Sequence, residues 1–276
     1  MTRIEGSTAA PCEDVLAIEE PLEIQVGVAD AGGVVHESVS ITMRTPGDDF
    51  ALAAGFLFTE GILSHRGQIE AIRHWGPLLG EEKVRNIVQV DLRAGVRVDF
   101  QRLKRNFYTS SSCGVCGKSS IAALRAAGCQ ALGGDGLRIS AALLHGLPDT
   151  LRGSQTVFSQ TGGLHAAALF RAGGELVLLR EDVGRHNAVD KVIGARFLAG
   201  DLPASDGILL VSGRASFELV QKAAMAGIPI LAAVGAPSSL AVELASSLGM
   251  TLAGFVRDGR FNIYCGESRI ECASGA

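Results

Sequence analysis

Apolar and polar residues alternate along the first part of the chain. Residues 22–28 place an apolar side chain at every second position, which is the period of a half-buried β-strand. Residues 34–43 alternate less regularly, and the turn Asp30-Ala31-Gly32-Gly33 separates the two segments. Two alternating runs joined by such a turn predict a β-hairpin.

One helix and further strands are predicted next. A mostly apolar run at 49–59 follows Pro46, whose missing N–H costs little at a helix entrance, so a buried helix is expected. Segments 84–92 and 96–100 predict two more strands around a turn at 93–95. The N-terminal part therefore predicts a small α+β unit.

Beyond residue 174, strands and helices alternate regularly. The strand segments are continuously apolar, and such strands alternating with helices predict a mostly parallel sheet with helices on both faces. Strands are expected at 176–179, 208–211, 229–234, 251–256 and 261–264, and helices at 185–198, 216–226 and 238–248. Helices are also expected earlier, at 118–127 and, on weaker periodicity, at 139–145.

The chain divides by pattern into four parts. Residues 1–20 predict a loose lead-in, 21–107 the small α+β unit, and 108–266 a cysteine-bearing loop with the larger α/β domain. Residues 267–276 form an acidic tail for which the sequence suggests no role.

Composition narrows the function classes. Of the 276 residues, 47% are hydrophobic, which is enough for a sizeable core, and the net charge of −4 argues against nucleic-acid binding. No apolar run is long enough to cross a bilayer, and residues 1–20 lack the pattern of a signal peptide. Four of the six cysteines are scattered along the chain, and this spacing does not indicate a disulfide framework. We therefore expect a cytoplasmic protein without membrane contact.

Cys113 and Cys116 form the only close cysteine pair. Serines precede the pair, glycines follow each cysteine, and a predicted helix at 118–127 comes next. A helix start favours a thiolate through its dipole and free N–H groups. We expect reactive or ligating sulfur on a loop that carries Cys113 to the sheet edge near His165 and Arg185.

Spacing alone leaves four interpretations of this pair. Half of a zinc knuckle would need a second pair, which the chain does not contain. A thioredoxin-like dithiol should follow a strand, and a zinc deaminase needs a His-x-Glu that His165-Ala166-Ala167 does not supply. A thiolate that forms a persulfide is the fourth interpretation.

Three turns rich in small residues follow predicted strands, at 181–187, 212–216 and 234–239. Each alone is weak evidence for a ligand, because such turns are common in α/β proteins and, for a single turn, a helix cap is the favoured explanation. Three at one sheet edge predict a polyanionic ligand such as a nucleotide, because helix N-termini bind phosphate, although no Gly-x-Gly-x-x-Gly or Walker A motif is present. The candidate ligand-binding residues are Gly163, His165, Arg185, His186, Ser212, Gly213 and Arg214.

Together these segments resemble the FdhD family of formate dehydrogenase accessory sulfurtransferases. The resemblance runs from about residue 20 to residue 264 and rests on the motifs Ser112–Gly117, Thr161–His165, Glu181–Lys191 and Ser212–Arg214. It implies an α/β fold with a cytidine deaminase-like mixed sheet and helices on both faces, without the zinc chemistry of that enzyme, plus the smaller N-terminal α+β unit.

The resemblance also implies a function. Members of the family take sulfur from a cysteine desulfurase and pass it to the molybdenum bis-guanine-dinucleotide cofactor, which is then inserted into formate dehydrogenase. Cys113 matches the persulfide-forming position, with Cys116 as its partner, and no metal ligand is implied. The cofactor-binding segment matches Phe255, Val256, Arg257, Asp258, Gly259 and Arg260.

We further expect a homodimer in which GDP-like guanine nucleotides can occupy the cofactor site. The residues themselves leave one alternative function open. This alternative is a zinc- or redox-dependent regulator that senses a nucleotide through the same sheet edge.

Overall fold

The structure is a computed structural model that describes residues 1–30, 32–78, 85–100, 131–132 and 136–272. Cys113, Cys116, the loop around them and the helix expected at 118–127 lie outside the described residues. The predictions made for that segment therefore stay predictions.

A four-stranded sheet forms the N-terminal part. Its strands are β3 (Glu20–Asp30), β4 (Gly33–Arg44), β5 (Ile69–Trp75) and β6 (Ile87–Leu92), in the order β4-β3-β6-β5. The alternation predicted the β3–β4 hairpin correctly, because Leu22, Ile24 and Val26 all point into the core with no exposed surface. Helix α1 (Asp49–Thr59) follows, as predicted.

A six-stranded sheet forms the larger part. Its order is β13-β12-β11-β10-β8-β9. The strands are β8 (His165–Arg171), β9 (Leu176–Asp182), β10 (Gly207–Val211), β11 (Ile230–Ala233), β12 (Thr251–Arg257) and β13 (Arg260–Cys265). The β10–β11 and β11–β12 pairs are parallel, whereas the other three pairs are antiparallel. The prediction of a mostly parallel sheet is therefore wrong, because short connections make hairpins of β8–β9 and β12–β13, and a hairpin can only be antiparallel.

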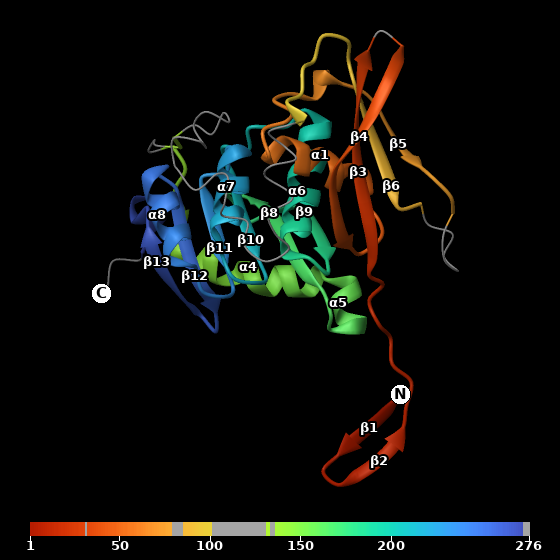
Figure 1. Cartoon of the computed structure of the whole chain (residues 1–276). Helices are drawn as coiled ribbons and strands as arrows, with labels where there is room; N and C mark the ends of the chain where they lie inside the picture. Colours follow the sequence, from red (N-terminus) through yellow and green to blue (C-terminus); the bar gives the residue numbers. More distant parts are fainter. Residues whose placement is uncertain (31, 79–84, 101–130, 133–135, 273–276) are drawn as a thin grey trace.

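Helices cover both faces of this sheet, as predicted. On one face lie α6 (Arg185–Ala199), α7 (Phe217–Met225) and α8 (Ser239–Ser247), and on the other lies α4 (Ala141–Ser154), which ends near the short α5 (Thr156–Thr161). Figure 1 shows the resulting layers, with α1 between α6 and the four-stranded sheet. One hydrophobic cluster runs from β3 through α1 and α6 to β10 and β11.

Helices α1 and α6 cross at a pair of glycines. A Cβ atom at Gly55 would overlap the backbone of Asp190 and Gly194, and a Cβ atom at Gly194 would overlap the backbone of Ala51. Only glycine lets the two backbones approach this closely. The crossing therefore fixes the four-stranded sheet against the larger one.

Several segments differ from the sequence prediction. Residues 96–99 form no strand; instead β5, which the pattern did not predict, pairs with β6. Val96, Val98 and Phe100 are partly buried against the core, but β6 is already paired with β3 on one edge and β5 on the other, so it has no free edge for a further strand. The expected loose lead-in contains a hairpin of β1 (Thr2–Glu5) and β2 (Thr8–Pro11), whose residues are all exposed and which stands away from the body in Figure 1.

Short elements complete the described chain. They are the 3-10 turns η1 (Arg66–Gln68) and η2 (Glu267–Arg269) and the strands β7 (Ile139–Ser140) and β14 (Ile270–Glu271). β14 pairs with β7 in parallel, and Arg269 is only 5% exposed. The start of the predicted tail is therefore packed onto the larger part.

Candidate functional site at the sheet edge

Five chain segments meet at one edge of the six-stranded sheet. Strands β10, β11 and β12 run in the same direction, so their C-terminal ends at Val211, Ala233 and Arg257 lie at that edge. Because β8 runs in the opposite direction and β9 pairs antiparallel with β8, β8 begins there at His165 and β9 ends there at Asp182. Ligands bind at such edges in open α/β sheets.

The turns after β10 and β11 are joined to each other by backbone hydrogen bonds. The Gly235 N–H donates to the Gly213 carbonyl over 3.0 Å, and the Ser238 N–H donates to the Ala215 carbonyl over 3.0 Å. A Cβ atom at Gly235 would lie 3.0 Å from the Gly213 oxygen, so the approach depends on the missing side chain. Two of the small-residue turns found in the sequence thus form one rigid surface.

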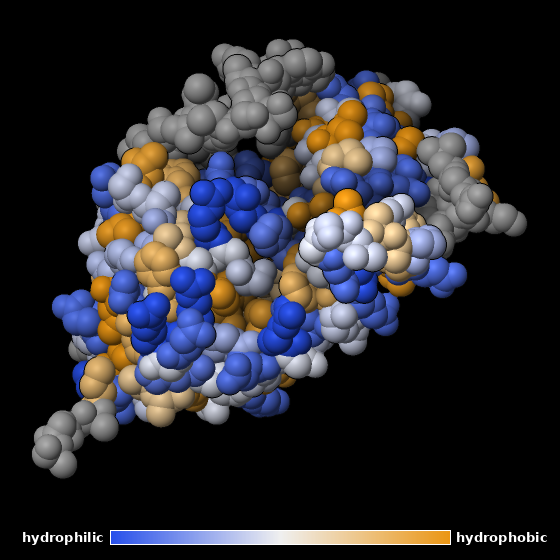
Figure 2. Space-filling model, turned by 90° about the horizontal axis from the view of Figure 1, so that it is seen from below, coloured by the Kyte–Doolittle hydropathy of each residue, from blue (hydrophilic) through white to orange (hydrophobic). Residues whose placement is uncertain are grey.

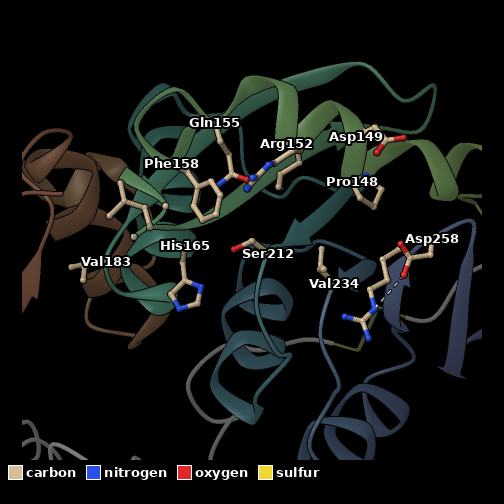
Figure 3. Close-up of a pocket in the computed structure, with 15 residues that line it drawn as sticks. Pro148, Asp149, Arg152, Gln155, Phe158, His165, Val183, Ser212, Val234 and Asp258 are labelled. Atoms are coloured by element: carbon tan, nitrogen blue, oxygen red, sulfur yellow. Dashed lines mark ion pairs between the residues drawn. The ribbon is translucent and has the colours of Figure 1, made fainter. Parts of the chain in front are cut away.

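A pocket of about 620 Å³ opens at this edge. This volume is within the usual range for small-molecule sites. The molecule is hollowed on its lower face, where strongly hydrophilic side chains stand beside hydrophobic ones (Figure 2). The pocket is lined by residues 148, 149, 151, 152, 155, 158, 162–165, 183, 212, 234, 257 and 258 (Figure 3).

His165 lies in the pocket at the first position of β8. A Cβ atom at Gly213 would lie 3.4 Å from the imidazole and 3.8 Å from the Arg185 Cδ, so these three residues are neighbours. Burial, with the nearby Arg185 and His186, lowers the pKa of His165 below its ordinary value. The imidazole is therefore neutral at neutral pH and can donate or accept a hydrogen bond.

His186 lies beside the pocket and is paired with a carboxylate. Its Nε2 lies 3.1 Å from Glu218 Oε2 and 3.3 Å from Ser216 Oγ, and Ser216 Oγ donates to the same carboxylate over 3.1 Å. The hydrogen bond to His186 lowers the pKa of Glu218 to about 2, against the opposing effect of burial. Glu218 is therefore an anion at any physiological pH.

One wall of the pocket comes from α4 and α5, and we call Arg152, Gln155 and Phe158 the α4–α5 wall. The guanidinium carbon of Arg152 lies 4.1 Å from the centre of the Phe158 ring. Gln155 is 4% exposed, and its Nε2 has no hydrogen-bond partner among the described residues. The amide and the guanidinium lie close together beside Phe158 in Figure 3.

The turn that carries the pocket residue Val183 is held from behind by buried polar contacts of Asp182, Asn187 and Lys191, which do not line the pocket themselves and which we call the α6 wall. Lys191 Nζ lies 2.8 Å from Asp182 Oδ2, and both side chains are at most 2% exposed. Asp182 Oδ1 accepts hydrogen bonds from the Gly184 N–H over 2.8 Å and from Asn187 Nδ2 over 3.0 Å. These contacts fix the turn that carries Val183 and Arg185.

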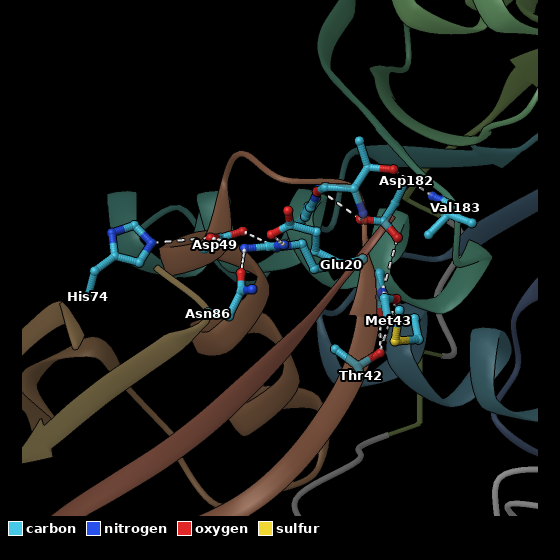
Figure 4. Close-up of polar contacts among 12 residues, drawn as sticks. Glu20, Thr42, Met43, Asp49, His74, Asn86, Asp182 and Val183 are labelled. Carbon is cyan, nitrogen blue, oxygen red and sulfur yellow. Dashed lines mark hydrogen bonds and ion pairs between the residues drawn. The ribbon is translucent and has the colours of Figure 1, made fainter. Parts of the chain in front are cut away.

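The α6 wall is also tied to the four-stranded sheet (Figure 4). Asn187 Nδ2 donates to the Met43 carbonyl over 2.8 Å, and Lys191 Nζ donates to the Thr45 carbonyl over 2.8 Å. The Val183 N–H in turn donates to Thr45 Oγ1 over 3.2 Å. The end of β4 thereby holds the turn at the pocket.

Two more buried ion pairs strengthen this junction. Arg44, with no exposed surface, donates from Nε and Nη2 to both carboxylate oxygens of Asp49 over 2.9 and 3.0 Å. Lys222 Nζ lies 2.8 and 2.9 Å from the two oxygens of Asp190, which also accepts a hydrogen bond from Thr59 Oγ1. Burial raises the pKa of Asp190. Burial also disfavours the charged form of Lys222, but the nearby carboxylates of Asp190 and Glu60 outweigh this effect and raise the pKa of Lys222. Removing either partner would leave the other buried without its ion-pair partner, which is strongly destabilising.

The structure brings together most of the candidate site residues. Gly163, His165, Ser212, Arg257 and Asp258 line the pocket, and Gly213, Arg185 and His186 lie directly beside His165 or Ser216. The described contacts do not place the others in the pocket: Val256 is buried in the core, and Phe255, Arg214, Gly259 and Arg260 do not line it.

The lead-in segment also reaches the pocket rim. A Cβ atom at Gly163 would lie 3.7 Å from the Cβ of Ala17. The exposed β1–β2 hairpin is therefore attached to the body close to the mouth of the pocket.

Sequence reasoning missed the α4–α5 wall. Its helix was expected to end at His145, whereas α4 continues through Pro148 to Ser154. The signal was present, because Leu144, Leu147 and Leu151 are buried at the spacing of one helix face. The role of Glu181 was missed as well: its carboxylate accepts hydrogen bonds from the Val157 and Phe158 N–H groups over 3.0 and 2.8 Å.

The fold and the pocket define an α/β protein with a ligand site at the edge of a mixed sheet. A model of the FdhD/NarQ family matches residues 17–271. The chain therefore belongs to the FdhD/NarQ family. In the described part of the chain, no helix is both long and apolar enough to span a membrane.

Relatives of known name agree with this assignment. The chain is 51% identical over 270 residues to the sulfur carrier protein FdhD of Streptomyces coelicolor, covering 97% of this chain and 93% of that protein. It is 49% identical over 261 residues to the protein of the same name in Mycobacterium tuberculosis, covering 93% and 92%. A crystal structure described as a formate dehydrogenase accessory protein from Desulfotalea psychrophila matches with a TM-score of 0.71 and 25% identity, covering 98% of this chain and 97% of that one.

Proposed function

We propose that this protein is a sulfur carrier for formate dehydrogenase. It takes persulfide sulfur from a cysteine desulfurase and transfers it to the molybdenum bis-guanine-dinucleotide cofactor, the acceptor substrate, before the cofactor enters the dehydrogenase. The observation that carries the proposal is the pocket at the sheet edge, where a neutral imidazole, two arginines and glycine-rich turns meet in a member of this family.

The chemistry assigns one role to each cysteine of the close pair. In loading, the Cys113 thiolate attacks the terminal sulfur of the desulfurase persulfide, which forms the Cys113 persulfide and releases the desulfurase thiol. In delivery, the Cys116 thiolate attacks the inner sulfur of that persulfide, so the terminal sulfur leaves as sulfide to the acceptor and a Cys113–Cys116 disulfide forms. A cellular dithiol reductant then restores both thiols.

Another cysteine near the core is a poor substitute for this pair. Cys265 is half-buried, its Sγ donates to the Met250 carbonyl over 3.4 Å, and burial raises its pKa. A protonated, hydrogen-bonded thiol is a weak nucleophile. Sulfur loading at Cys265 is therefore not expected.

The pocket suits part of the acceptor. A volume of about 620 Å³ accommodates one nucleotide-sized group, and Arg152 and Arg257 supply cations from two sides. The acceptor carries two guanine dinucleotides, so the rest of it must lie outside this pocket. The homodimer, the cytoplasmic location and the cytidine deaminase-like fold belong to the same proposal, and size-exclusion chromatography tests the first of these.

The decisive experiment is mass spectrometry after incubation with a cysteine desulfurase and cysteine. The wild-type protein should gain about 32 Da, one sulfur atom, on Cys113. Cys113→Ala should abolish loading and formate dehydrogenase maturation, whereas Cys116→Ala should load sulfur but not release it. Cys272→Ala is the matched control, because Cys272 is an exposed free cysteine, and it should load normally.

Two results would contradict the proposal. A Cys113→Ala protein that still matures formate dehydrogenase would show that the sulfur takes another route. Stoichiometric zinc on Cys113 and Cys116 would instead favour the zinc-dependent regulator.

Ligand binding gives a second test with an internal control. Arg257 lines the pocket, whereas Arg260, its partner across the β12–β13 turn, does not. Arg257→Ala should weaken GDP binding about 10-fold or more, because it removes a charge-assisted contact, and Arg260→Ala should change it little. Equal affinities in calorimetry for the wild type and Arg257→Ala would remove Arg257 from the site.

A further inference from the structure

The α4–α5 wall carries hydrogen-bond donors that the protein itself does not use. Gln155 is 4% exposed, yet its Nε2 has no partner among the described residues. A buried donor without a partner costs stability, so such donors are kept where a ligand satisfies them. Gln155 lines the pocket, which brings this donor to a place that a ligand can reach by a small adjustment.

Arg152 adds a cation that forms no ion pair with any described carboxylate. The Arg152 guanidinium carbon lies 4.1 Å from the Phe158 ring centre, so one face of the guanidinium is held and its N–H groups stay free. A guanidinium fork of this kind matches the oxygens of a phosphate group. The stacked arrangement therefore presents donors in a fixed orientation.

Phe158, the support of this arginine, is itself fixed. Its backbone N–H donates to Glu181 over 2.8 Å, and the neighbouring Val157 N–H donates to the same carboxylate over 3.0 Å. The first N–H groups of α5 are thus already occupied, so the free donors of this wall are side chains. Because Arg152 covers one face of the ring, at most the other face of Phe158 is left for a base to stack on.

We infer that Arg152 and Gln155 bind a phosphate or diphosphate group of the ligand, in a subsite separate from the one that holds the base. This inference rests on the proposed function, which supplies a nucleotide-bearing acceptor. It assigns a role to the α4–α5 wall, none of whose residues the sequence motifs include. Arg257 on the far side of the pocket is left for another part of the ligand.

Calorimetry with GDP, guanosine and inorganic pyrophosphate tests the subsite. Arg152→Ala should weaken GDP and pyrophosphate binding about 10- to 100-fold and leave guanosine binding unchanged. Arg152→Lys should lose part of this affinity, because an ammonium group lacks the fork. Arg171→Ala is the matched control, since Arg171 is an exposed arginine that pairs with the exposed Glu175.

Gln155→Leu separates a ligand-binding role from a structural one. Removing an unsatisfied buried donor should raise the melting temperature of the free protein, while the same change should weaken GDP binding. A purely structural glutamine would give a lower melting temperature and unchanged affinity.

The possible outcomes test the phosphate subsite and the proposed function separately. If Arg152→Ala binds GDP as well as the wild type does, the subsite is wrong and the proposed function is untouched. If the variant loses guanosine and GDP equally, the wall holds the base and the phosphate assignment is wrong. If the wild type binds pyrophosphate but not guanosine, the phosphate subsite is supported and the guanine ligand is refuted. If the wild type binds none of the three probes, both the phosphate subsite and the guanine ligand are refuted.

Discussion

The α4–α5 wall, which lines the pocket, and the α6 wall, which lies behind the Val183 turn, differ in how their polar groups are paired. In the α6 wall, the carboxylate of Asp182 contacts Lys191, Asn187 and the backbone N–H of Gly184, and the whole group is buried. In the α4–α5 wall, Gln155 Nε2 and the Arg152 guanidinium have no such partners in the described chain. A fully paired network is rigid, whereas unpaired donors remain available to a ligand.

This difference changes how the sequence motif from Glu181 to Lys191 is understood. Its charged residues suggested ligand contact, yet Asp182 and Lys191 pair with each other, Asp190 pairs with Lys222, and Glu181 holds α5. Most of the motif therefore builds the pocket. Arg185 and His186 lie beside His165, and Val183 lines the pocket.

The largest expected effect is in the paired wall. Lys191→Met should lower the free energy of unfolding by about 3–5 kcal/mol, because it leaves the buried carboxylate of Asp182 without a cation. Urea unfolding measures the loss. Arg196→Met is the control on the same helix: its ion pair with Asp201 is partly exposed, so its removal should cost less than about 1 kcal/mol. Similar losses in both variants would contradict the comparison.

The next largest effect is expected at Glu181, whose side chain connects the motif beside the α6 wall to α5. Glu181→Ala should cost about 1–2 kcal/mol, because the N–H groups of Val157 and Phe158 lose their acceptor. It should also weaken GDP binding, since Phe158 no longer supports Arg152. Glu175→Ala, at an exposed position, should leave both the unfolding midpoint and the affinity unchanged.

A smaller effect depends on pH. The pKa of Glu218 is about 2 in the folded protein against an ordinary value of 4.5, so the unfolded state binds its proton first as the pH falls. Its contribution, about 1 kcal/mol after solvent screening, is present above pH 4.5 and is lost as the pH falls towards 2. Glu218→Gln should flatten this part of the stability curve; a curve identical to that of the wild type would place the shift elsewhere.

The smallest effect on stability is expected at the open wall. Arg152→Ala removes an exposed cation–π contact and should cost less than about 1 kcal/mol in thermal or urea unfolding. The same substitution is expected to cause a large loss of GDP affinity. A loss of several kcal/mol would show that Arg152 is structural and that the two walls are alike.

Much of the fold could be predicted from the sequence, because continuous apolar strands and amphipathic helices leave a regular pattern. The helix from Arg185 and the strands at the sheet edge were found in this way. The β8–β9 and β12–β13 pairings were not, because strand direction depends on connection length and not on periodicity. β5 was missed because its residues are at best partly buried and alternate weakly.

Site residues in a turn that follows a predicted strand could be predicted from the sequence. Site residues that only the tertiary fold brings to the pocket were missed. Ser212 and Arg257 directly follow predicted strands, so topology brings them together, whereas His165 begins β8, for which no strand was predicted. Arg152 comes from a helix that was expected to end at His145, Gln155 follows the last residue of that helix, and nothing local marks either as a ligand-binding residue. The roles of Cys113 and Cys116 rest on the family resemblance and on the proposed chemistry.

The glycine crossing of α1 and α6 has a consequence for the synthesis of the protein. Helix α1 packs on the four-stranded sheet with one face and on α6 with the face around Gly55. Gly194 follows Gly55 by about 140 residues, which take about 7–28 s to translate. Until α6 has been synthesised, the nascent N-terminal unit lacks the helix that covers this face of α1, and the exposed apolar surface can aggregate during that interval.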